Sequence, residues 1–519
     1  MNNTTRSRMK TSKEIFPLVV IAAMTVGIRL WIGPRTVDDA YITFRYAHNI
    51  ARGVGFVYNA GEKVLGTTTP LFALILAALT PFSSNLEAVA MVINTIADVG
   101  TAVFMYMIVI RTTDRSLAAL VCALLFSFSA GSIRFTAGGM ETGVFVFLIV
   151  MSSWLFLGEH YLLSSVSVGL ATLTRPEGLI LLVAMVGIYL LRHGRFPWKM
   201  TIAAGVVLLP WIVFAIAYFG SPIPHSVIAK RAVYHFPPFV ALKSLLGYLI
   251  EYTIPLSGII LPRLLKYGFY GALLLLGSIA AYSTIRRQPN FAVFWLFPVI
   301  YIGAYAIANP PVWEWYAVPL VPFSSYVVVV GSGELVGFIK ERFYRTRREN
   351  LFWVTILLTS MLLAGLYQVV YILHHDPRQG RELVYADIVR RLDGGRGWAG
   401  KTIAAPEIGT LGYLLPDARI FDTQGLISPQ ALPFHREEEI RAEDNNVQDE
   451  WNSVGSIPAA LVRDEQPDVV ITLEVFARSL LGDPWFIKHY RLVLKEPSAV
   501  FGSDGVLVFQ HRNDSPFRK

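Results

Sequence analysis

Long apolar runs separated by short polar stretches dominate the first three quarters of the chain. The first run extends from Ile15 to Ile32 and is interrupted only by Arg29. A run of this length is long enough to cross a bilayer as a helix. Because basic residues concentrate on the cytoplasmic side of membrane proteins, the cluster at 6–13 predicts a cytoplasmic N-terminus.

The same alternation of apolar runs and short polar stretches predicts about eleven membrane-spanning helices (spans), or up to thirteen. Basic clusters at 111–115, 192–199, 286–287 and 340–348 lie between apolar runs and are expected in the cytoplasm. The spans expected after the first are Leu86–Ile110, Leu117–Ala130, Thr142–Leu157, Tyr161–Leu173, Gly178–Leu191, Thr201–Phe219, Gly268–Ile285, Phe291–Ala308, Trp315–Phe338 and Leu351–Leu373. Two further stretches, Pro70–Pro81 and Ala241–Leu261, do not fit the alternation and predict surface-lying or re-entrant helices.

After Leu373 short apolar runs alternate with polar segments, which predicts strands in a small α/β domain. The runs are Thr402–Ala405, Arg419–Phe421, Asp468–Leu473, Tyr490–Leu494 and Val506–Phe509. The expected fold is a polytopic α-helical membrane protein with a C-terminal extracytoplasmic α/β domain. We expect the membrane domain at 1–375, with a first outer loop at 33–69, and the soluble domain at 376–519.

Composition supports this class. The chain is 54% hydrophobic, its mean hydropathy is +0.49 and only 16% of its residues are charged, which is more apolar surface than a soluble core could hide. The basic excess lies before residue 376, with 28 Lys and Arg against 15 Asp and Glu, whereas the remainder has 17 against 22. Short loops between spans carry that excess, so it indicates orientation and not nucleic-acid binding. The single cysteine, Cys122, excludes an internal disulfide.

Two adjacent carboxylates, Asp38 and Asp39, open the sequence DDAYITFRYAHN directly after the first span, on the expected outer face. A carboxylate there can take a proton from a hydroxyl group or hold a divalent cation. The alternative is a cap for the helix that follows. We expect one role for each residue, with Asp38 as the general base and Asp39 as the cap. The pair would supply only part of a metal coordination shell.

Five motifs in chain order resemble those of the GT-C superfamily of polytopic membrane glycosyltransferases. They are DDAYITFRYAHNIARGVGFVYNAGEKVLGTTTPLF, GGMETG, LATLTRPEGLILL, YFGSPIPHSVIAK and EIGTLGYLLPDARIFDTQGLISP. Within that superfamily the chain is most similar to proteins like the terminal arabinofuranosyltransferase of mycobacterial cell walls. More distantly it is similar to aminoarabinose and protein-mannosyl transferases.

This resemblance implies an enzyme of the plasma membrane. Such enzymes take a sugar from a polyprenyl-phosphate donor and transfer it to a cell-envelope glycan, lipid or protein on the outer face. The resemblance implies membrane lipids as surroundings and no tightly bound cofactor, with a divalent cation at the Asp pair as an option. The motifs do not code for the sugar, the acceptor or the oligomeric state.

A phosphate leaving group requires positive charge nearby. Arg45 lies two turns after Asp38 on the same helix face, and Arg175, His225 and Lys230 also fall in segments expected outside. We expect these four side chains to bind the donor phosphate, Lys230 foremost. The alternatives are snorkelling or structural ion pairs for the cations, and a plain hydrogen-bonding role for His225.

Acceptor or sugar contacts are expected from Glu141 in GGMETG and from the aromatic cluster Trp313, Trp315 and Tyr316. Glu141 could instead complement a helix dipole, and the aromatic side chains could anchor the chain at the membrane interface. The alternative function is a transporter or flippase of lipid-linked saccharides, which intramembrane charges such as Asp98 would favour. A scaffolding membrane protein would need no acidic pair at its first outer loop.

Overall fold

The computed structural model describes residues 12–234, 236–253, 263–342, 378–392, 398–435 and 456–513, with a few positions between 359 and 374. The chain forms two compact units. The first unit contains Met1–Arg35, Ala90–Leu209 and Phe239–His375. The second unit contains Thr36–Val89, Pro210–Pro238 and Asp376–Lys519. The second unit therefore joins the C-terminal segment to two segments from the first half of the chain.

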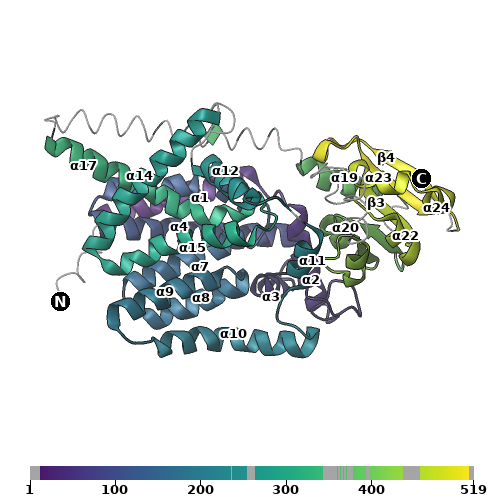
Figure 1. Cartoon of the computed structure of the whole chain (residues 1–519), viewed down its shortest axis with the longest axis horizontal. Helices are drawn as coiled ribbons and strands as arrows, with labels where there is room; N and C mark the ends of the chain where they lie inside the picture. Colours follow the sequence, from purple (N-terminus) through teal and green to yellow (C-terminus); the bar gives the residue numbers. More distant parts are fainter. Residues whose placement is uncertain are drawn as a thin grey trace. The chain divides into compact units, whose positions relative to one another are not determined.

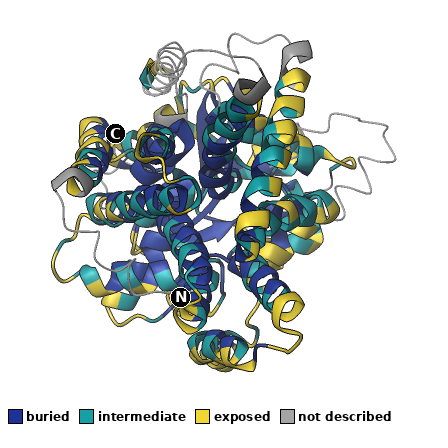
Figure 2. Cartoon of the chain, turned by 90° about the vertical axis from the view of Figure 1, so that its left-hand side faces the viewer, coloured by how far each residue is buried: buried dark blue, intermediate teal, exposed yellow. Residues whose placement is uncertain are grey.

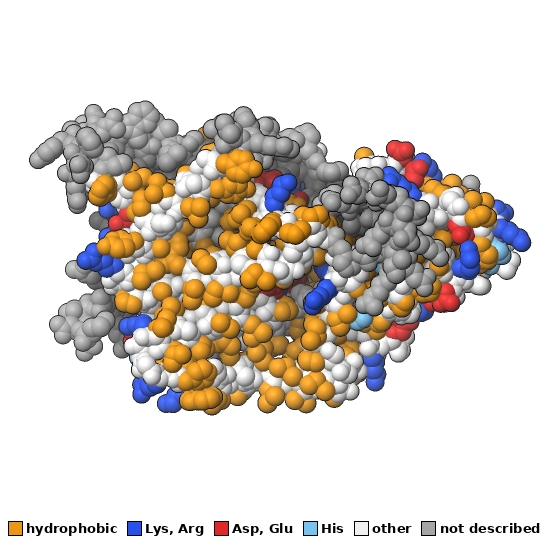
Figure 3. All heavy atoms as spheres, in the orientation of Figure 1, with side chains coloured by type: hydrophobic (Ala, Val, Ile, Leu, Met, Phe, Trp, Pro, Cys, Tyr) orange, Lys and Arg blue, Asp and Glu red, His pale blue; other side chains and the backbone are white. Residues whose placement is uncertain are grey.

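The first unit is helical (Figure 1). Its helices are α1 (Ser12–Ile32), α4 (Leu86–Thr113, from Ala90 onward), α5 (Ser116–Ser127), α6 (Ala130–Ala137), α7 (Thr142–Leu157), α8 (Tyr161–Thr174), α9 (Gly178–His193), α10 (Trp198–Phe219, to Leu209), α12 (Val240–Thr253), α14 (Arg263–Arg287), α15 (Ala292–Ala308), α16 (Val321–Tyr326) and α17 (Ser332–Arg342). Many helices are buried along one side and exposed along the other (Figure 2). Over the helical part, the face in Figure 3 is mainly hydrophobic and carries few charges.

Six helical segments of the described residues are long and apolar enough to cross a membrane, or seven if the pair α5 and α6, bent by 48°, forms one span. The six are Ile15–Ile32, Leu86–Thr113, Trp198–Phe219, Tyr267–Arg287, Pro289–Ala308 and Glu314–Phe338, which all match expected spans. The chain is therefore a multi-pass membrane protein. The expected span Leu351–Leu373 lies almost wholly outside the described residues, so the total stays a prediction.

Three other expected spans are present as shorter helices. They are α7, α8 and α9, with 16, 14 and 16 residues. At 1.5 Å per residue α8 is about 21 Å long, which is less than the hydrocarbon thickness of about 30 Å. Of the two expected surface-lying or re-entrant stretches, the first forms the ten-residue helix α3 (Pro70–Leu79) in the second unit and the described part of the other forms α12.

A buried ion pair joins two membrane helices of the first unit. The guanidinium of Arg29 on α1 donates to Asp98 Oδ2 on α4, with N···O distances of 2.7 and 3.0 Å. The same oxygen accepts hydrogen bonds from Ser132 and Thr136. Both charged side chains are at most 1% exposed, so removing one partner would leave an uncompensated buried charge.

The second unit contains a mixed five-stranded sheet with strand order β2-β1-β3-β5-β4. The strands are β1 (Thr402–Ala405), β2 (Arg419–Asp422), β3 (Val469–Leu473), β4 (Tyr490–Glu496) and β5 (Val506–His511), which confirms the five predicted strands. β1 runs parallel to β2 and β3, and β5 runs antiparallel to β3 and β4. The helices of this unit are α2 (Asp38–Ala51), α3, α11 (His225–Val233), α19 (Arg378–Arg391), α20 (Gly409–Leu414), α22 (Ala459–Glu465), α23 (Arg478–Leu481) and α24 (Pro484–His489).

Alternation along the strands gives this sheet two apolar faces. Along β3, Val469 and Ile471 face a cluster with α2 and α19, whereas Val470 faces a cluster with α22 and α24. The first cluster includes Tyr46 and Tyr58, so the segment after the first span supplies part of the core around the sheet. The fold of the C-terminal strands therefore depends on residues more than 300 positions earlier.

The edge strand β2 is paired by a side chain from that early segment. Asn59 Nδ2 donates to the carbonyl of Ile420 over 2.8 Å, and the Ile420 N–H donates to Asn59 Oδ1 over 3.1 Å. The amide thus satisfies both backbone groups of one strand residue, as a neighbouring strand would. This contact protects the edge of the sheet from pairing with another chain.

We predict that α10 separates the two sides of the membrane. In a Cys122→Ala background, a cysteine at Ser221 should react with an impermeant thiol reagent in intact cells, whereas one at Gly194 should react only after lysis. Gly194 precedes α10 within a basic loop and Ser221 follows its last residue, Phe219. Labelling of the Gly194 site without lysis would reverse the orientation.

Candidate active site

Helix α2 holds the short helix α20 at both ends. Asp38 Oδ1 accepts hydrogen bonds from the backbone N–H and the hydroxyl of Thr410, both over 2.8 Å, and Oδ2 accepts from the Gly409 N–H over 3.0 Å. Arg45, seven residues later, donates to the carbonyls of Gly412, Leu415 (3.1 Å) and Ala418 (2.8 Å), close to the other end of α20. A negative group at the helix N-terminus and a positive group near its C-terminus both complement the helix dipole.

Two glycines allow the close approach of these helices. A Cβ atom at Gly409 would lie 1.7 Å from the carbonyl oxygen of Asp38, and one at Gly412 would lie 1.7 Å from the hydroxyl oxygen of Tyr58. Either position would therefore require backbone or ring displacement on substitution. The remaining donors of Arg45 reach the carbonyl of Tyr58 over 2.7 Å and Asn59 over 3.2 Å.

The contacts between α2 and α20 affect the roles that we expected for Arg45 and Asp38. The guanidinium of Arg45 is 3% exposed and contacts protein oxygens with each of its three nitrogens, so the geometry favours a structural role over phosphate binding. The Asp38 carboxylate is 5% exposed and caps α20, whereas the cap that we expected was for α2 itself, whose N-cap residue Val37 makes no side-chain hydrogen bond. This geometry favours Asp39 over Asp38 as the general base, and both assignments stay predictions.

Asp39 is half-buried and accepts no hydrogen bond from the part of the chain that the structure describes. Burial raises the pKa of Asp39 above its usual value of 3.8, while the positive charges of Lys230 on α11 and Arg381 on α19 lower it and Asp38 raises it. A carboxylate with a raised pKa and free oxygens close to cations is suited to proton abstraction beside an anionic group.

A second set of polar side chains joins α19 to the segment after β1. Arg381 donates to Glu382 over 2.7 Å and to Glu407, and the Tyr385 hydroxyl donates to Glu407 over 2.5 Å. Glu382 Oε1 also accepts the backbone N–H of Asp38 over 3.1 Å. Burial raises the pKa of Glu407 to about 7, despite the opposing effect of Arg381. These residues fix the start of α2 where Asp39 lies.

Buried polar atoms without partners collect after β2. The amide of Gln424 and the hydroxyl of Thr423 make no hydrogen bond, although these side chains are 4% and 0% exposed. Asp422 holds this turn by accepting the backbone N–H groups of Gln424 (2.8 Å) and Ile427 (3.0 Å). Burial raises the pKa of Asp422 to about 6, and these backbone donors oppose that effect.

His225 lies beside the same turn. Its backbone N–H donates to the carbonyl of Leu65 over 2.7 Å, and its ring contacts the backbone of Gly425. Its Nε2 and the Ser226 hydroxyl are buried without a hydrogen-bond partner. Burial lowers the pKa of His225, which keeps the ring neutral and able to accept or donate a hydrogen bond. Segments from three parts of the chain therefore present unsatisfied polar groups in one unit.

The remaining expected residues belong to the first unit. Arg175 donates to Glu177 over 3.0 Å, as the alternative interpretation expected, and lies 3.7 Å from Glu141 and 4.8 Å from the ring centre of Tyr316. Glu141 immediately precedes α7 and is 6% exposed. The rings of Trp313, Trp315 and Tyr316 are stacked in sequence, with centroid distances of 6.0 and 5.8 Å. Glu141 and Arg175 are thus buried beside a half-buried aromatic cluster, and the contacts of these residues with substrate stay predictions.

The Asp pair offers a poor donor set for a divalent cation. Both oxygens of Asp38 already accept hydrogen bonds, so only Asp39 has free oxygens. Within the described ranges, no three His, Cys, Asp or Glu side chains form a group that could hold a metal ion. Hard cations such as Ca²⁺ and Mg²⁺ need about six ligands, so we derive no step through a metal.

A curated relative shares part of the sequence. The terminal beta-(1->2)-arabinofuranosyltransferase of Corynebacterium glutamicum is 27% identical over 255 residues, which are 41% of this chain and 36% of that protein. The match thus spans about a third of that relative's length. No family model matches the chain.

Solved structures match almost the whole chain. ArnT from Cupriavidus metallidurans bound to undecaprenyl phosphate has a TM-score of 0.60, with 96% of this chain and 99% of that chain covered at 13% identity. The Archaeoglobus fulgidus oligosaccharyltransferase has a TM-score of 0.54, with 98% of this chain and 76% of that chain covered at 13% identity. The chain has the GT-C fold. At this identity the structural likeness establishes the fold alone.

Several polar residues near this site were not singled out from the sequence. Arg381, Glu382 and Glu407 lie beyond residue 375, in the segment that we expected to form a soluble α/β domain. Thr423 and Gln424 stand in the motif FDTQGLISP, which we quoted for the resemblance without assigning its polar residues. The available signal was their position after short apolar runs, because ligands often bind at the carboxyl ends of parallel strands.

We predict that Asp38→Ala destabilises the second unit of the GT-C chain, whereas Asp39→Ala does not. Removing the Asp38 carboxylate leaves the buried donors of Gly409 and Thr410 unsatisfied, which should cost about 2 kcal/mol. Thermal unfolding of the two purified variants in detergent tests the difference. An Asp38→Ala midpoint equal to that of Asp39→Ala would show that the cap contributes nothing.

Proposed function

We propose that this protein is a membrane glycosyltransferase that moves a sugar from a polyprenyl phosphate to an acceptor at the outer membrane surface. The observation that carries the proposal is the Asp39 carboxylate, which is half-buried, lacks a hydrogen bond within the described chain and experiences the charges of Lys230 and Arg381. A base adjacent to cations suits the attack of a hydroxyl group on a sugar that leaves a phosphate.

Asp39, Lys230 and Arg381 each have a different role in the proposed reaction. The acceptor oxygen bonds to the anomeric carbon, and Asp39 takes its proton. The bond from that carbon to the phosphate oxygen breaks, and polyprenyl phosphate leaves with one more negative charge. Lys230 stabilises that charge as it develops. Arg381, which already binds Glu382 and Glu407, adds its field without direct contact.

The unsatisfied groups after β2 supply a place for sugar hydroxyls. Gln424 offers one acceptor and two donors, and Thr423 and Ser226 offer hydroxyl groups. An unpaired buried amide costs about 1–3 kcal/mol, so a ligand that satisfies it gains that much over one that does not. We propose that these side chains distinguish the donor sugar or the acceptor.

The comparisons support the donor class. The ArnT structure contains undecaprenyl phosphate, and the partial relative is named as an arabinofuranosyltransferase. We propose a polyprenyl-phosphate sugar as donor and a cell-envelope glycan, lipid or protein as acceptor. The expected orientation, with a cytoplasmic N-terminus and residues 33–69 and 376–519 outside, belongs to the same proposal.

No observation now favours the transporter. That alternative rested on the intramembrane carboxylate of Asp98, and this group is bound by Arg29, Ser132 and Thr136. A carboxylate with four hydrogen bonds to a fixed partner set is suited to holding helices together. The Asp98 side chain is also only 1% exposed, which leaves little surface for a moving substrate.

We predict that Asp39→Asn abolishes transfer and leaves the binding of undecaprenyl phosphate unchanged within about twofold. The amide keeps the shape of the carboxylate but cannot accept the proton, a role typically worth 10²–10⁴-fold in rate. Turnover of a panel of polyprenyl-phosphate sugars by the purified variants measures the effect. Asp504→Asn, a distant exposed aspartate in the same unit, is the matched control. Wild-type turnover by Asp39→Asn would remove Asp39 from the mechanism.

If Asp39 is the general base, its pKa determines the pH below which transfer activity falls. Because burial raises the pKa of Asp39 above 3.8, the base should be lost by protonation at a higher pH than an ordinary aspartate would be. Lys230→Met should shift this acid limb upward, since the positive charge that lowers the pKa is then absent.

We further predict that Lys230→Gln weakens the binding of undecaprenyl phosphate about tenfold or more, whereas Arg231→Gln has little effect. Both residues lie in the last turn of α11, but Lys230 is half-buried and acts on Asp39, whereas Arg231 is exposed. Direct binding to the two purified variants provides the comparison. Equal affinities would place the phosphate elsewhere.

A further inference from the structure

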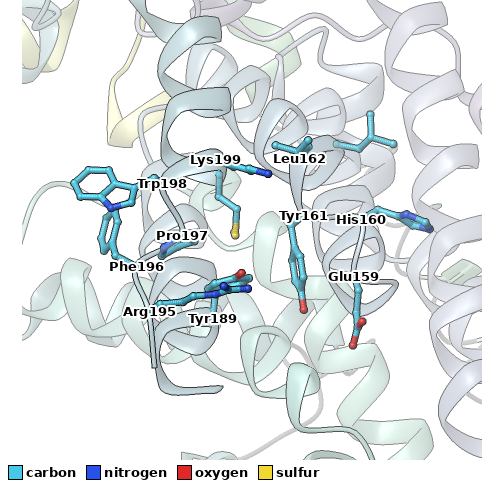
Figure 4. A pocket seen from close by; sticks show the side chains of 12 residues that line it. Glu159, His160, Tyr161, Leu162, Tyr189, Arg195, Phe196, Pro197, Trp198 and Lys199 are labelled. Atoms are coloured by element: carbon cyan, nitrogen blue, oxygen red, sulfur yellow. The ribbon is translucent and has the colours of Figure 1, made fainter. Parts of the chain in front are cut away.

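A cavity of about 590 Å³ opens at one end of three helices of the first unit (Figure 4). It is bounded by the segment before α8, the last turns of α9 and the first residues of α10. Its volume is within the usual range of ligand sites in proteins, about 300–1,000 Å³. None of the residues that line it belongs to the proposed active site.

The chain geometry keeps this end open. α9 ends at His193, and its C-cap residue Gly194 has a φ of 64°, the left-handed conformation that glycine adopts without strain. Glu159, with a φ of 64°, turns the chain into α8. Pro197 directly precedes α10 and cannot continue a helix from the preceding residues. The two tight turns thus separate the helix ends around the cavity.

Positive charge without an internal partner faces this cavity. Arg195 and Lys199 both line it, are exposed, and make no ion pair or side-chain hydrogen bond within the described part of the chain. The lining carboxylate of Glu159 lies 3.9 Å from Arg192, and that pair offsets one positive charge. The net charge at the opening is therefore positive.

Aromatic and aliphatic side chains form the rest of the wall. Trp198 is 68% exposed and Leu163 is 60% exposed, and Tyr161 and Tyr189 lie in edge-to-face contact. Trp and Tyr concentrate where the acyl chains of a membrane meet the headgroups. Because α10 is apolar and only 11% of its span is buried, Trp198 begins a helix that faces lipid.

The adjacent helices are too short for the hydrocarbon layer. α8 and α9, with 14 and 16 residues, reach about 21 and 24 Å, against about 30 Å for the bilayer core. A lipid headgroup must therefore follow the helix ends inward, or the bilayer must thin beside them. The cavity with its two cations lies at those ends.

We propose that this cavity binds the headgroup of an anionic glycerophospholipid, with its phosphate between Arg195 and Lys199 and its acyl chains along Leu163 and Trp198. The phosphate of such a lipid matches the cations of the cavity, and the adjoining hydrocarbon chains match its apolar walls. A free phosphate ion would use the cations only and leave the exposed apolar walls uncovered. Each basic residue near a membrane surface contributes about 1 kcal/mol toward an anionic lipid.

The test measures the affinity of the full-length protein in neutral detergent for phosphatidylglycerol, phosphatidylcholine and inorganic phosphate. We expect wild type to prefer phosphatidylglycerol, and Arg195→Gln/Lys199→Gln to bind it on the order of 30-fold more weakly. The charge-preserving exchange Arg195→Lys/Lys199→Arg should retain affinity. The control Arg286→Gln/Arg287→Gln removes two exposed charges from the last turn of α14, neither of which lines the cavity, and should have no effect.

A second measurement does not depend on variants. A photoactivatable phosphatidylglycerol should label wild type within residues 189–200, and excess phosphatidylglycerol should suppress this labelling. Equal affinity of wild type and the Gln double variant, no preference over phosphatidylcholine, or labelling elsewhere would each overturn the proposal. Competition by inorganic phosphate alone, at the same concentration as the lipid, would also overturn it.

Discussion

The charge spacing on α2 determines how the second unit is arranged. Asp38 and Arg45 are seven residues apart, so they lie on one helix face about two turns from each other. That distance matches the length of α20, whose first N–H groups donate to Asp38 and whose carbonyls near the other end accept from Arg45. Once α20 is held in this way, Asp39 turns away from it. The remaining carboxylate is then free to face Lys230 and Arg381.

Burial gives the candidate site its acid–base character. Asp39, Glu382, Glu407 and Asp422 all have raised pKa values, with burial as the main cause in each case. Such groups favour the folded state most when they are protonated. The contribution of Glu407 is complete below its ordinary pKa of 4.5 and is lost as the pH rises through about 7. A bound cation would stabilise the ionised forms of these four carboxyl groups. The leaving phosphate is an anion, so it requires Lys230 and Arg381 to remain near Asp39.

The sequence predicted the helices and strands better than it predicted the contacts between distant segments. Hydropathy gave six long spans, and alternating short runs gave all five strands, because both patterns follow from burial of local segments. It also placed Asp38 and Arg45 on one face of α2. It could not show that α20, more than 350 residues later, covers this face, so Arg45 was expected to bind phosphate. The local sequence pattern indicates which face of a helix is polar. What that face binds depends on the distant segment that packs against it.

The dependence of the sheet on an early segment also orders the folding of the chain. Asp38 and Gly409 are 371 residues apart, so the hydrogen bond between them cannot form until the C-terminal segment has been synthesised. At 5–20 residues per second this interval is roughly 20–75 s. During it the apolar side chains of Tyr46 and Tyr58 lack the strands against which they pack. Until the strands have been made, the stretch from Ile42 to Leu65 therefore lacks the packing that buries it in the folded unit.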